Sequence, residues 1–137
     1  MCGRYAAAKD PASLVGEFEV AEQLVDEPLK PDWNVAPTKR VYVVMERRAK
    51  DAPETATAPR QLRIAKWGLV PSWAKDPSIG SRMINARVET VAEKPSFRRA
   101  FVARRCILPA DGYYEWYEPE GDDVPRTASG KPRKQPF

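Results

Sequence analysis

Two segments near the middle of the chain have the apolar patterning of buried β-strands. Residues 41–45 are apolar and mostly β-branched or aromatic, and residues 61–68 carry apolar side chains at Leu62, Ile64 and Trp67. Polar or Pro-rich sequence borders these runs, as is typical of strand ends. A strand is therefore predicted in each segment.

Two other segments carry helical signals. In residues 9–20, Asp10 precedes Pro11, which predicts a helix with an aspartate N-cap and a proline in its first turn. The apolar residues that follow fall on one side of that helix. A second short helix is predicted around Phe97 and Phe101, which are four residues apart.

The remaining pattern is one of turns and loops. Residues 105–118 are predicted to form two strands joined by a turn at the Asp-Gly pair. Pro-rich and polar sequence predicts irregular loops over residues 28–38, 48–60, 69–81 and 119–134. Short strands mixed with two modest helices indicate an α+β fold with a mainly antiparallel sheet or open barrel.

Length and composition fit a single domain over residues 1–137. Hydrophobic residues make up 42% of the chain and charged residues 31%, which is an ordinary balance for a globular protein. No apolar run approaches the roughly 20 residues of a membrane span, and the N-terminus lacks a signal-peptide pattern. These observations predict a cytoplasmic protein without a membrane partner.

The positive charge is concentrated in one segment. The chain has a formal net charge of +4, whereas residues 82–105 alone contain seven basic and two acidic residues, a net +5. Six of the seven bases are arginine, which suits bidentate contact with phosphate. A solvated, salt-bridged face is the alternative explanation. The bases are Arg82, Arg87, Lys94, Arg98, Arg99, Arg104 and Arg105.

Two cysteines, Cys2 and Cys106, and the absence of histidine limit the possible chemistry. Neither cysteine has a second one at metal-binding spacing, so we expect no metal and no cofactor. In a reducing compartment both thiols are predicted to be free. Cys106 stands beside Ile107 and Leu108, which predicts an inert thiol in the core.

Cys2 has a chemistry that no internal cysteine has. Removal of Met1 would leave an α-amine and a thiol on the same residue. The amine can form an imine with an aldehyde, and the thiol can then close a five-membered thiazolidine. A cysteine of no function at this position is the alternative, and Met1, if retained, would block the reaction.

Five short motifs change the interpretation of Cys2. They are WNVAPT, WGLVPSWA, INARVET, KPSFR and LPADGYYEW, in that order after the initial MCGR. The chain thereby resembles the SOS response-associated peptidase (SRAP) family, whose members crosslink to abasic sites in single-stranded DNA. The motifs extend from Cys2 to about Trp116. Each motif is weak alone, but their shared order is specific.

The resemblance implies a role for each matching residue. Cys2 would form the thiazolidine, Asn85 would hold the sugar or the reacting nitrogen, and Glu115 would act as general acid and base. Six further residues would contact DNA: Arg87 at a phosphate, Trp116 by stacking, and Arg4, Asn34, Pro37 and Trp67 around the same pocket.

Structural alternatives exist for these residues. Glu115 could be an edge charge, and Asn85 could satisfy the backbone of a turn. Trp67 and Trp73 are more simply explained as core residues, and Trp33 as a packing residue.

The sequence departs from the family pattern in two ways. Family members are longer and use a histidine downstream of the YEW strand, whereas this chain has none and stops at Phe137. We therefore expect an SRAP-like domain that is truncated after the YEW strand and incomplete at its C-terminus, with a second polypeptide as a possible complement.

Three functions follow from these features. The first is an abasic-site sensor that traps single-stranded DNA covalently through Cys2, with lyase-like or Met1-removing peptidase activity as an open question. The alternative is a non-covalent single-strand binding module, or an inactive fragment without the downstream histidine. A thiol hydrolase using Cys2 is disfavoured because no histidine base is present.

Overall fold

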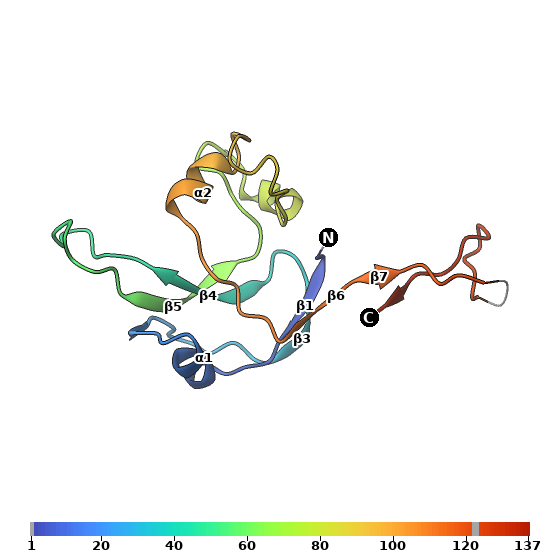
Figure 1. Ribbon diagram of the computed structural model, residues 1–137, viewed down its shortest axis with the longest axis horizontal. Helices are drawn as coiled ribbons and strands as arrows, with labels where there is room; N and C mark the ends of the chain where they lie inside the picture. Colours follow the sequence, from blue (N-terminus) through green and yellow to red (C-terminus); the bar gives the residue numbers. More distant parts are fainter. Residues whose placement is uncertain (1, 122–123) are drawn as a thin grey trace.

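The computed structural model describes residues 2–121 and 124–137, so the prediction of Met1 removal lies outside the described residues. Two three-stranded sheets lie next to each other near the middle of the molecule, and a two-stranded arm extends to one side (Figure 1). The sheets are small and do not close into a barrel. The predicted α+β fold with antiparallel sheets and few short helices is confirmed. No helix in the described part is long and apolar enough to cross a membrane.

The first sheet holds the N-terminus. Its central strand β1 (Arg4–Ala7) pairs antiparallel with β3 (Asp32–Val35) and with β6 (Gly112–Tyr114). The prediction of an irregular loop over residues 28–38 is wrong at β3. Two prolines suggested a loop, but pairing with β1 determines the conformation of the short segment between them.

The second sheet contains the two strands that were predicted from apolar patterning. Strands β4 (Arg40–Glu46) and β5 (Arg60–Lys66) pair antiparallel, and the short β2 (Glu22–Gln23) adds a parallel pairing to β5. Both predicted strands are confirmed. The polar segment between β4 and β5 forms the loop of this long hairpin (Figure 1).

Helix α1 (Pro11–Glu17) begins as the sequence predicts. The Asp10 carboxylate accepts a hydrogen bond from the Ser13 backbone N–H at 3.0 Å, and Pro11 takes the first helical position. This bond satisfies one of the free donors at the helix start. The helix buries Leu14 against the second sheet.

Strand β4 joins two apolar clusters because both of its faces are covered. Val41 and Val43 belong to a first cluster, which also contains Tyr5, Val35 and Trp67 and connects the two sheets. The alternate β4 residues Tyr42 and Val44 belong to a second cluster with Leu14 and Leu62 beneath α1. The first cluster supports the start of β1.

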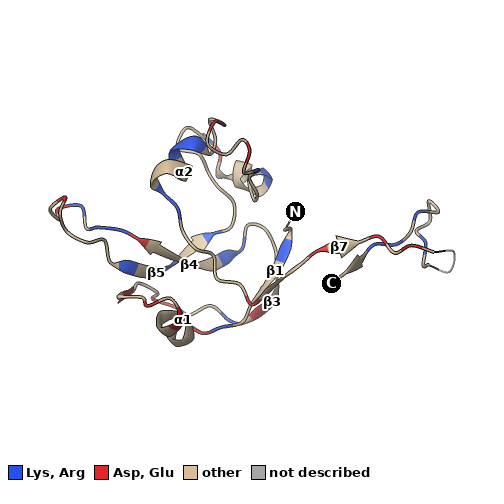
Figure 2. Ribbon diagram, viewed as in Figure 1, with Lys and Arg blue, Asp and Glu red and all other residues tan. Residues whose placement is uncertain are grey.

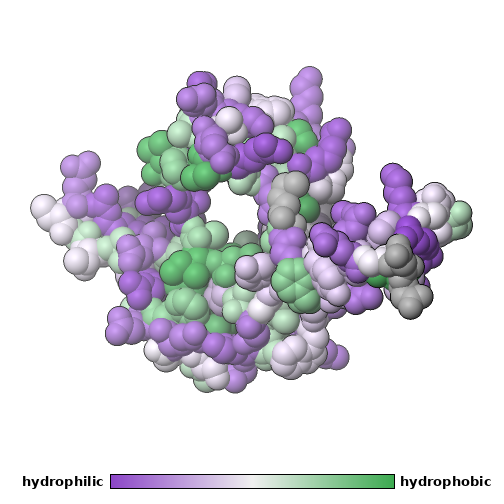
Figure 3. All heavy atoms as spheres, turned by 45° about the vertical axis from the view of Figure 1, so that its right-hand side comes forward, coloured by the Kyte–Doolittle hydropathy of each residue, from purple (hydrophilic) through white to green (hydrophobic). Residues whose placement is uncertain are grey.

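The upper part of the molecule consists of loops with a 3-10 helix, η1 (Pro77–Arg82), and the helix α2 (Arg98–Ala103). The short helix predicted around Phe97 and Phe101 is confirmed as α2. In the space-filling view an opening lies between this part and the sheets, with apolar side chains along its edges (Figure 3).

The predicted hairpin over residues 105–118 is wrong. Ile107 forms an isolated bridge with Val44 of β4, while β6 pairs with β1. Strand β7 (Trp116–Tyr117) instead pairs with β8 (Gln135–Pro136) in the extended arm. Asp111 forms a bend and Gly112 begins β6, so the chain passes to the first sheet instead of folding back on itself.

The prediction that Cys106 is an inert thiol in the core is wrong. Its side chain is exposed beside a hollow of about 600 Å³ that Val102, Arg105 and Ile107 help to line. Partial burial raises the pKa of the Cys106 thiol. The neighbouring Ile107 and Leu108 suggested a buried strand, but Ile107 contributes only a single bridge.

Candidate functional site at the start of strand β1

Cys2 lies two residues before the start of β1 and is half-buried against the first cluster. Its thiol donates a long hydrogen bond to the backbone carbonyl of Arg4, with 3.5 Å between sulfur and oxygen. The side-chain amide of Asn85 donates to the Cys2 carbonyl at 2.6 Å. The second residue of the chain is thus held from both its side chain and its backbone.

The segment that carries Asn85 is fixed by Trp67. The Trp67 indole N–H donates to the carbonyl of Ile84 at 3.0 Å, and the Leu69 N–H donates to the carbonyl of Met83, also at 3.0 Å. Trp67 is buried and packs edge-to-face against Tyr5, with ring centroids 5.2 Å apart. Trp67 therefore supports the site from the core instead of presenting its ring to solvent.

Two glycines allow this segment to approach the chain after Trp67. Gly68 has φ +128°, a conformation that residues with a side chain rarely adopt. A Cβ atom at Gly68 would lie 2.4 Å from the carbonyl oxygen of Gly80 in η1. The close contact between the backbones of Gly68 and Gly80 determines how near the chain after Trp67 lies to the loop that leads to Asn85.

A groove of about 550 Å³ opens beside Cys2. The Arg4 guanidinium donates to the side-chain oxygen of Asn34 at 3.0 Å, and the Tyr114 hydroxyl donates to the carbonyl of Trp33 at 2.7 Å. These contacts hold three strands of the first sheet together at one end. The groove is lined by Gly3, Arg4, Asn34, Tyr114, Trp116 and Pro136.

The other predicted site residues lie around the same end of β1. Glu115 follows β6, whose last residue pairs with Arg4, and its backbone exchanges hydrogen bonds with Phe137 at 3.2 and 3.0 Å. Pro37 stands two residues after Val35, which pairs with Tyr5, so the antiparallel register brings it to this end.

Arg87 is exposed two residues beyond Asn85. Basic residues also occur on β1 and along α2 (Figure 2). Positive charge is thus present both at the start of β1 and in the upper part of the molecule.

Two ionisable side chains of the first sheet have shifted pKa values. The ion pair with Lys39, at 2.5 Å, is the main cause that lowers the pKa of Asp32, and the backbone N–H of Asn34 adds to it. Burial raises the pKa of Tyr5 to about 12, and the charges of Asp32 and Cys2 contribute. Tyr5 therefore stays protonated across the physiological range.

Four aromatic residues differ from the sequence prediction or were missed by it. Trp33 and Trp73, expected to pack inside, are 64% and 56% exposed. Tyr5 and Tyr114 were not singled out, although Tyr5 directly follows the MCGR motif and Tyr114 belongs to YYEW. The strand alternation that puts Tyr114 beside Arg4 depends on pairing between distant segments, which the sequence does not reveal.

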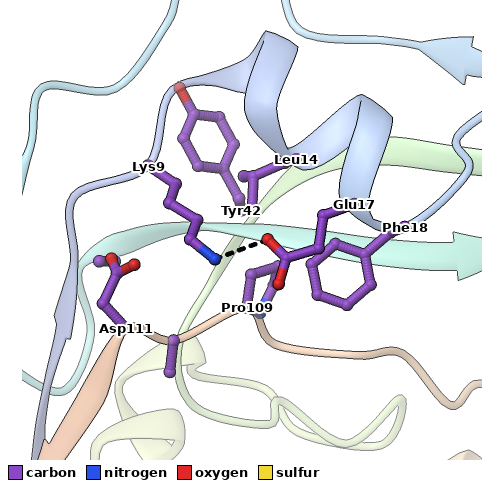
Figure 4. Close-up of a pocket in the computed structure, with 9 residues that line it drawn as sticks. Lys9, Leu14, Glu17, Phe18, Tyr42, Pro109 and Asp111 are labelled. Carbon is purple, nitrogen blue, oxygen red and sulfur yellow. Dashed lines mark hydrogen bonds and ion pairs between the residues drawn. The ribbon is translucent and has the colours of Figure 1, made fainter.

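A second pocket, beneath α1, is not connected with this chemistry. Figure 4 shows the Lys9 ammonium between the carboxylates of Glu17 and Asp111. Lys9 and Glu17 form an ion pair at 2.6 Å, and Asp111 accepts the Ala8 backbone N–H, also at 2.6 Å. The pocket encloses about 20 Å³, which is enough for one water molecule.

The site contains no arrangement suited to a metal. Among residues 2–121 and 124–137, no group of three or more His, Cys, Asp or Glu side chains could hold a metal ion. The functional groups of the residues around the start of β1 are a thiol, an amide, a carboxyl group, a guanidinium group and aromatic rings. They suit nucleophilic addition and hydrogen bonding to a polar, anionic ligand.

Curated relatives match most of this chain. The abasic site processing protein YoqW of Bacillus subtilis is 39% identical over 116 residues, which is 85% of this chain and 48% of that protein. The abasic site processing protein HMCES of Gallus gallus is 31% identical over 138 residues, covering 91% and 41%. The chain thus spans about half the length of these relatives.

A solved structure and a family model complete the comparison. A crystal structure of a protein from Bacteroides thetaiotaomicron shares the fold, with TM-score 0.67 and 21% identity over 90% of this chain and 52% of that one. The sequence model described as SOS response associated peptidase (SRAP) matches residues 1–137. This protein belongs to the SOS response associated peptidase (SRAP) family.

Proposed function

We propose that this protein processes abasic sites in DNA by forming a covalent bond to them through Cys2. The names of the curated relatives, abasic site processing proteins, support the class of lesion. The observation that carries the proposal is the half-buried Cys2, whose carbonyl is held by Asn85 at the edge of the groove beside Arg4. A thiol on a chain terminus would otherwise be mobile.

The proposed reaction needs the α-amine of Cys2. Hydrolysis of the Met1–Cys2 peptide bond consumes one water and frees this amine. The amine attacks the aldehyde of the ring-opened abasic sugar, and loss of one water gives an imine. The Cys2 sulfur then adds to the imine carbon, the nitrogen takes the proton of the thiol, and a thiazolidine results.

Each neighbouring residue has a defined part in this reaction. Asn85 fixes the Cys2 backbone, so amine and thiol keep one orientation relative to the sugar. Glu115 transfers protons during loss of water and ring closure, since it follows the strand that pairs with Arg4.

The DNA strand would be held by side chains around the groove. Arg4 and Arg87 bind phosphates next to the lesion, and Asn34 positions the Arg4 guanidinium, as their 3.0 Å hydrogen bond supports. Trp116 stacks where the lesion interrupts the bases, because its ring is 53% exposed at the groove.

The test is intact mass after incubation with a single-stranded oligonucleotide that carries one abasic site, followed by denaturation. The expected product is the chain without Met1 plus the oligonucleotide minus one water. Cys2→Ala and Cys2→Ser should give none, and Cys106→Ser should react like the wild type. A chain prepared with Cys2 as its first residue removes any dependence on Met1 processing.

Non-covalent binding of single-stranded DNA is the second candidate. The exposed rings of Trp33 and Trp116 and the basic segment 82–105 favour it. It predicts binding that weakens with salt, is equal for damaged and undamaged strands and survives Cys2→Ala. Absence of a covalent product from the chain starting at Cys2, together with such binding, would favour this candidate over the covalent one.

A further inference from the structure

Tyr5 carries a buried hydroxyl group that has no part in the reaction proposed above. Its side chain is 2% exposed, and its hydroxyl has no hydrogen-bond partner among the residues that the structure describes. Buried hydroxyl groups are normally paired, because an unpaired one loses its bonds to water without replacement. An unpaired hydroxyl in the cluster against which Cys2 packs therefore points to a partner that appears during the reaction.

The surroundings of Tyr5 contain few atoms that could accept its proton. The first cluster consists of valines and Trp67, with partly buried Cys2, Ala7, Met45, Ala65 and Ile84 against it. The Trp67 N–H is a donor and is already bound to the carbonyl of Ile84. The side-chain acceptors left in the cluster are the sulfurs of Met45 and Cys2, and a thioether accepts only weakly.

The present contact of Cys2 depends on its proton. As a thiol, Cys2 donates to the carbonyl of Arg4. When the sulfur loses that proton, two acceptors face each other and the contact becomes repulsive. A thiolate in this position needs a donor, and ionised sulfur accepts hydrogen bonds far better than a thiol does.

We propose that Tyr5 is a positioning residue for Cys2, whose hydroxyl donates a hydrogen bond to the Cys2 sulfur once the thiol has ionised. The bond would turn the sulfur from the Arg4 carbonyl toward the core side of the site and stabilise the nucleophilic form. This inference rests on the proposed function only in taking Cys2 as the nucleophile. It adds a residue that holds the sulfur between ionisation and ring closure.

Electrostatic coupling supports the proposal. Burial is the largest cause that raises the pKa of Tyr5, followed by the charge of Asp32 and then that of Cys2, so Cys2 lies within electrostatic range of Tyr5. With that pKa at about 12, the hydroxyl keeps its proton at every pH at which the thiol reacts. The other charged groups at this end of β1 are Arg4, Asp32 with its partner Lys39, and Glu115.

The test is alkylation of Cys2 by iodoacetamide, followed by peptide mass mapping, in a Cys106→Ser background of the full chain. Tyr5→Phe removes only the hydroxyl. At pH 7 we expect it to slow Cys2 alkylation roughly tenfold, the effect of about one lost hydrogen bond to a charged group. At pH 10, where thiols in general are ionised, the two rates should converge.

Controls separate this role from a structural one. Tyr113→Phe deletes the same hydroxyl from an exposed residue that pairs with Tyr5, and it should leave Cys2 alkylation unchanged. Met45→Leu removes the competing acceptor and should also have no effect. Thermal melting checks that each variant is folded.

Two results would overturn the proposal: equal alkylation of wild type and Tyr5→Phe at pH 7, or a deficit that persists undiminished at pH 10. The latter would indicate altered access to Cys2. Because no DNA is used, either result is independent of whether the chain crosslinks to abasic sites.

Discussion

The amide of Asn85 and the carbonyl of Cys2 are 2.6 Å apart, although 83 positions separate the residues in sequence. This bond fixes the backbone of Cys2, the proposed nucleophile, without touching its thiol. We expect Asn85→Ala to reduce the rate of covalent trapping of an abasic oligonucleotide at least tenfold, because a misplaced nucleophile loses its orientation. The free energy of unfolding should fall by only about 1 kcal/mol, the usual value of one hydrogen bond.

Asn85→Asp provides the matched comparison for that prediction. It keeps the size of the side chain but replaces the donor with a carboxylate that faces the Cys2 carbonyl. Both variants should trap slowly in a time course resolved on denaturing gels. Trapping by Asn85→Asp at the wild-type rate would show that the donated hydrogen bond is not required.

Glu115 can be tested for a part in exposing the amine of Cys2. If its carboxyl group assists hydrolysis of the Met1–Cys2 bond, Glu115→Gln should retain Met1 when the chain is produced without aminopeptidase activity. Wild type made in the same way should lack it. Intact mass distinguishes the two forms by the mass of one methionine residue, and equal loss of Met1 in both proteins would contradict this role.

Trp116 and Tyr117 offer a matched pair for the DNA contact. They are neighbours on β7, so their side chains point to opposite faces, and only Trp116 lines the groove beside Arg4. Trp116→Ala should weaken binding to single-stranded DNA roughly tenfold through loss of a stacked base. Tyr117→Ala, which removes a ring that packs on Phe137, should leave affinity nearly unchanged in fluorescence anisotropy.

Tyr5 makes the stability of the fold sensitive to alkali. Its pKa is about 12 in the folded protein and near 10 in the unfolded chain, because burial disfavours the phenolate. The resulting stabilisation is complete below pH 10 and is lost as the pH rises from 10 to 12. The total is about 2–3 kcal/mol.

Urea titrations across that range would measure this loss. Wild type should lose more stability between pH 10 and pH 12 than Tyr5→Phe, which cannot ionise at this position. Tyr113→Phe should behave like wild type because Tyr113 is largely exposed. Parallel curves for wild type and Tyr5→Phe would contradict the assignment of the effect to Tyr5.

The Gly68 crossing links the stability of the core to the placement of Asn85. Gly68→Ala would put a Cβ atom 2.4 Å from the Gly80 oxygen and strain a backbone at φ +128°. We expect a loss of about 1–3 kcal/mol in unfolding free energy and slower trapping. Gly112→Ala, where a Cβ atom meets nothing within 4 Å, is the control and should match wild type in trapping.

The elements predicted correctly from the sequence are those that short-range patterns determine. Strands β4 and β5 follow from apolar runs, and α1 follows from the Asp10–Pro11 pair that begins it. Strand β3 was missed because its conformation depends on pairing with β1. The Asp-Gly pair predicted a hairpin turn, but strand β6 beginning at Gly112 joins β1, a partner more than a hundred residues earlier.

The candidate site shows the same division. The sequence motifs predicted Cys2, Arg4, Asn34 and Asn85 as site residues, and the structure brings these four together through direct hydrogen bonds or shared strands. The burial of Trp67 agrees with its interpretation as a core residue at the end of an apolar strand pattern, whereas the exposure of Trp33 and Trp73 is not visible in the sequence.

Because of the long-range hydrogen bonds around β1, the position of Cys2 becomes fixed only when the fold is complete. Asn85 binds Cys2, Tyr114 binds Trp33 and Asp111 binds Ala8, across 83, 81 and 103 positions. Such contacts form late, since distant segments must meet first. During synthesis Cys2 leaves the ribosome long before residues 85–114 exist, so a nascent chain carries an ordinary flexible cysteine. Positioning of Cys2 is thereby a property that only the folded protein acquires.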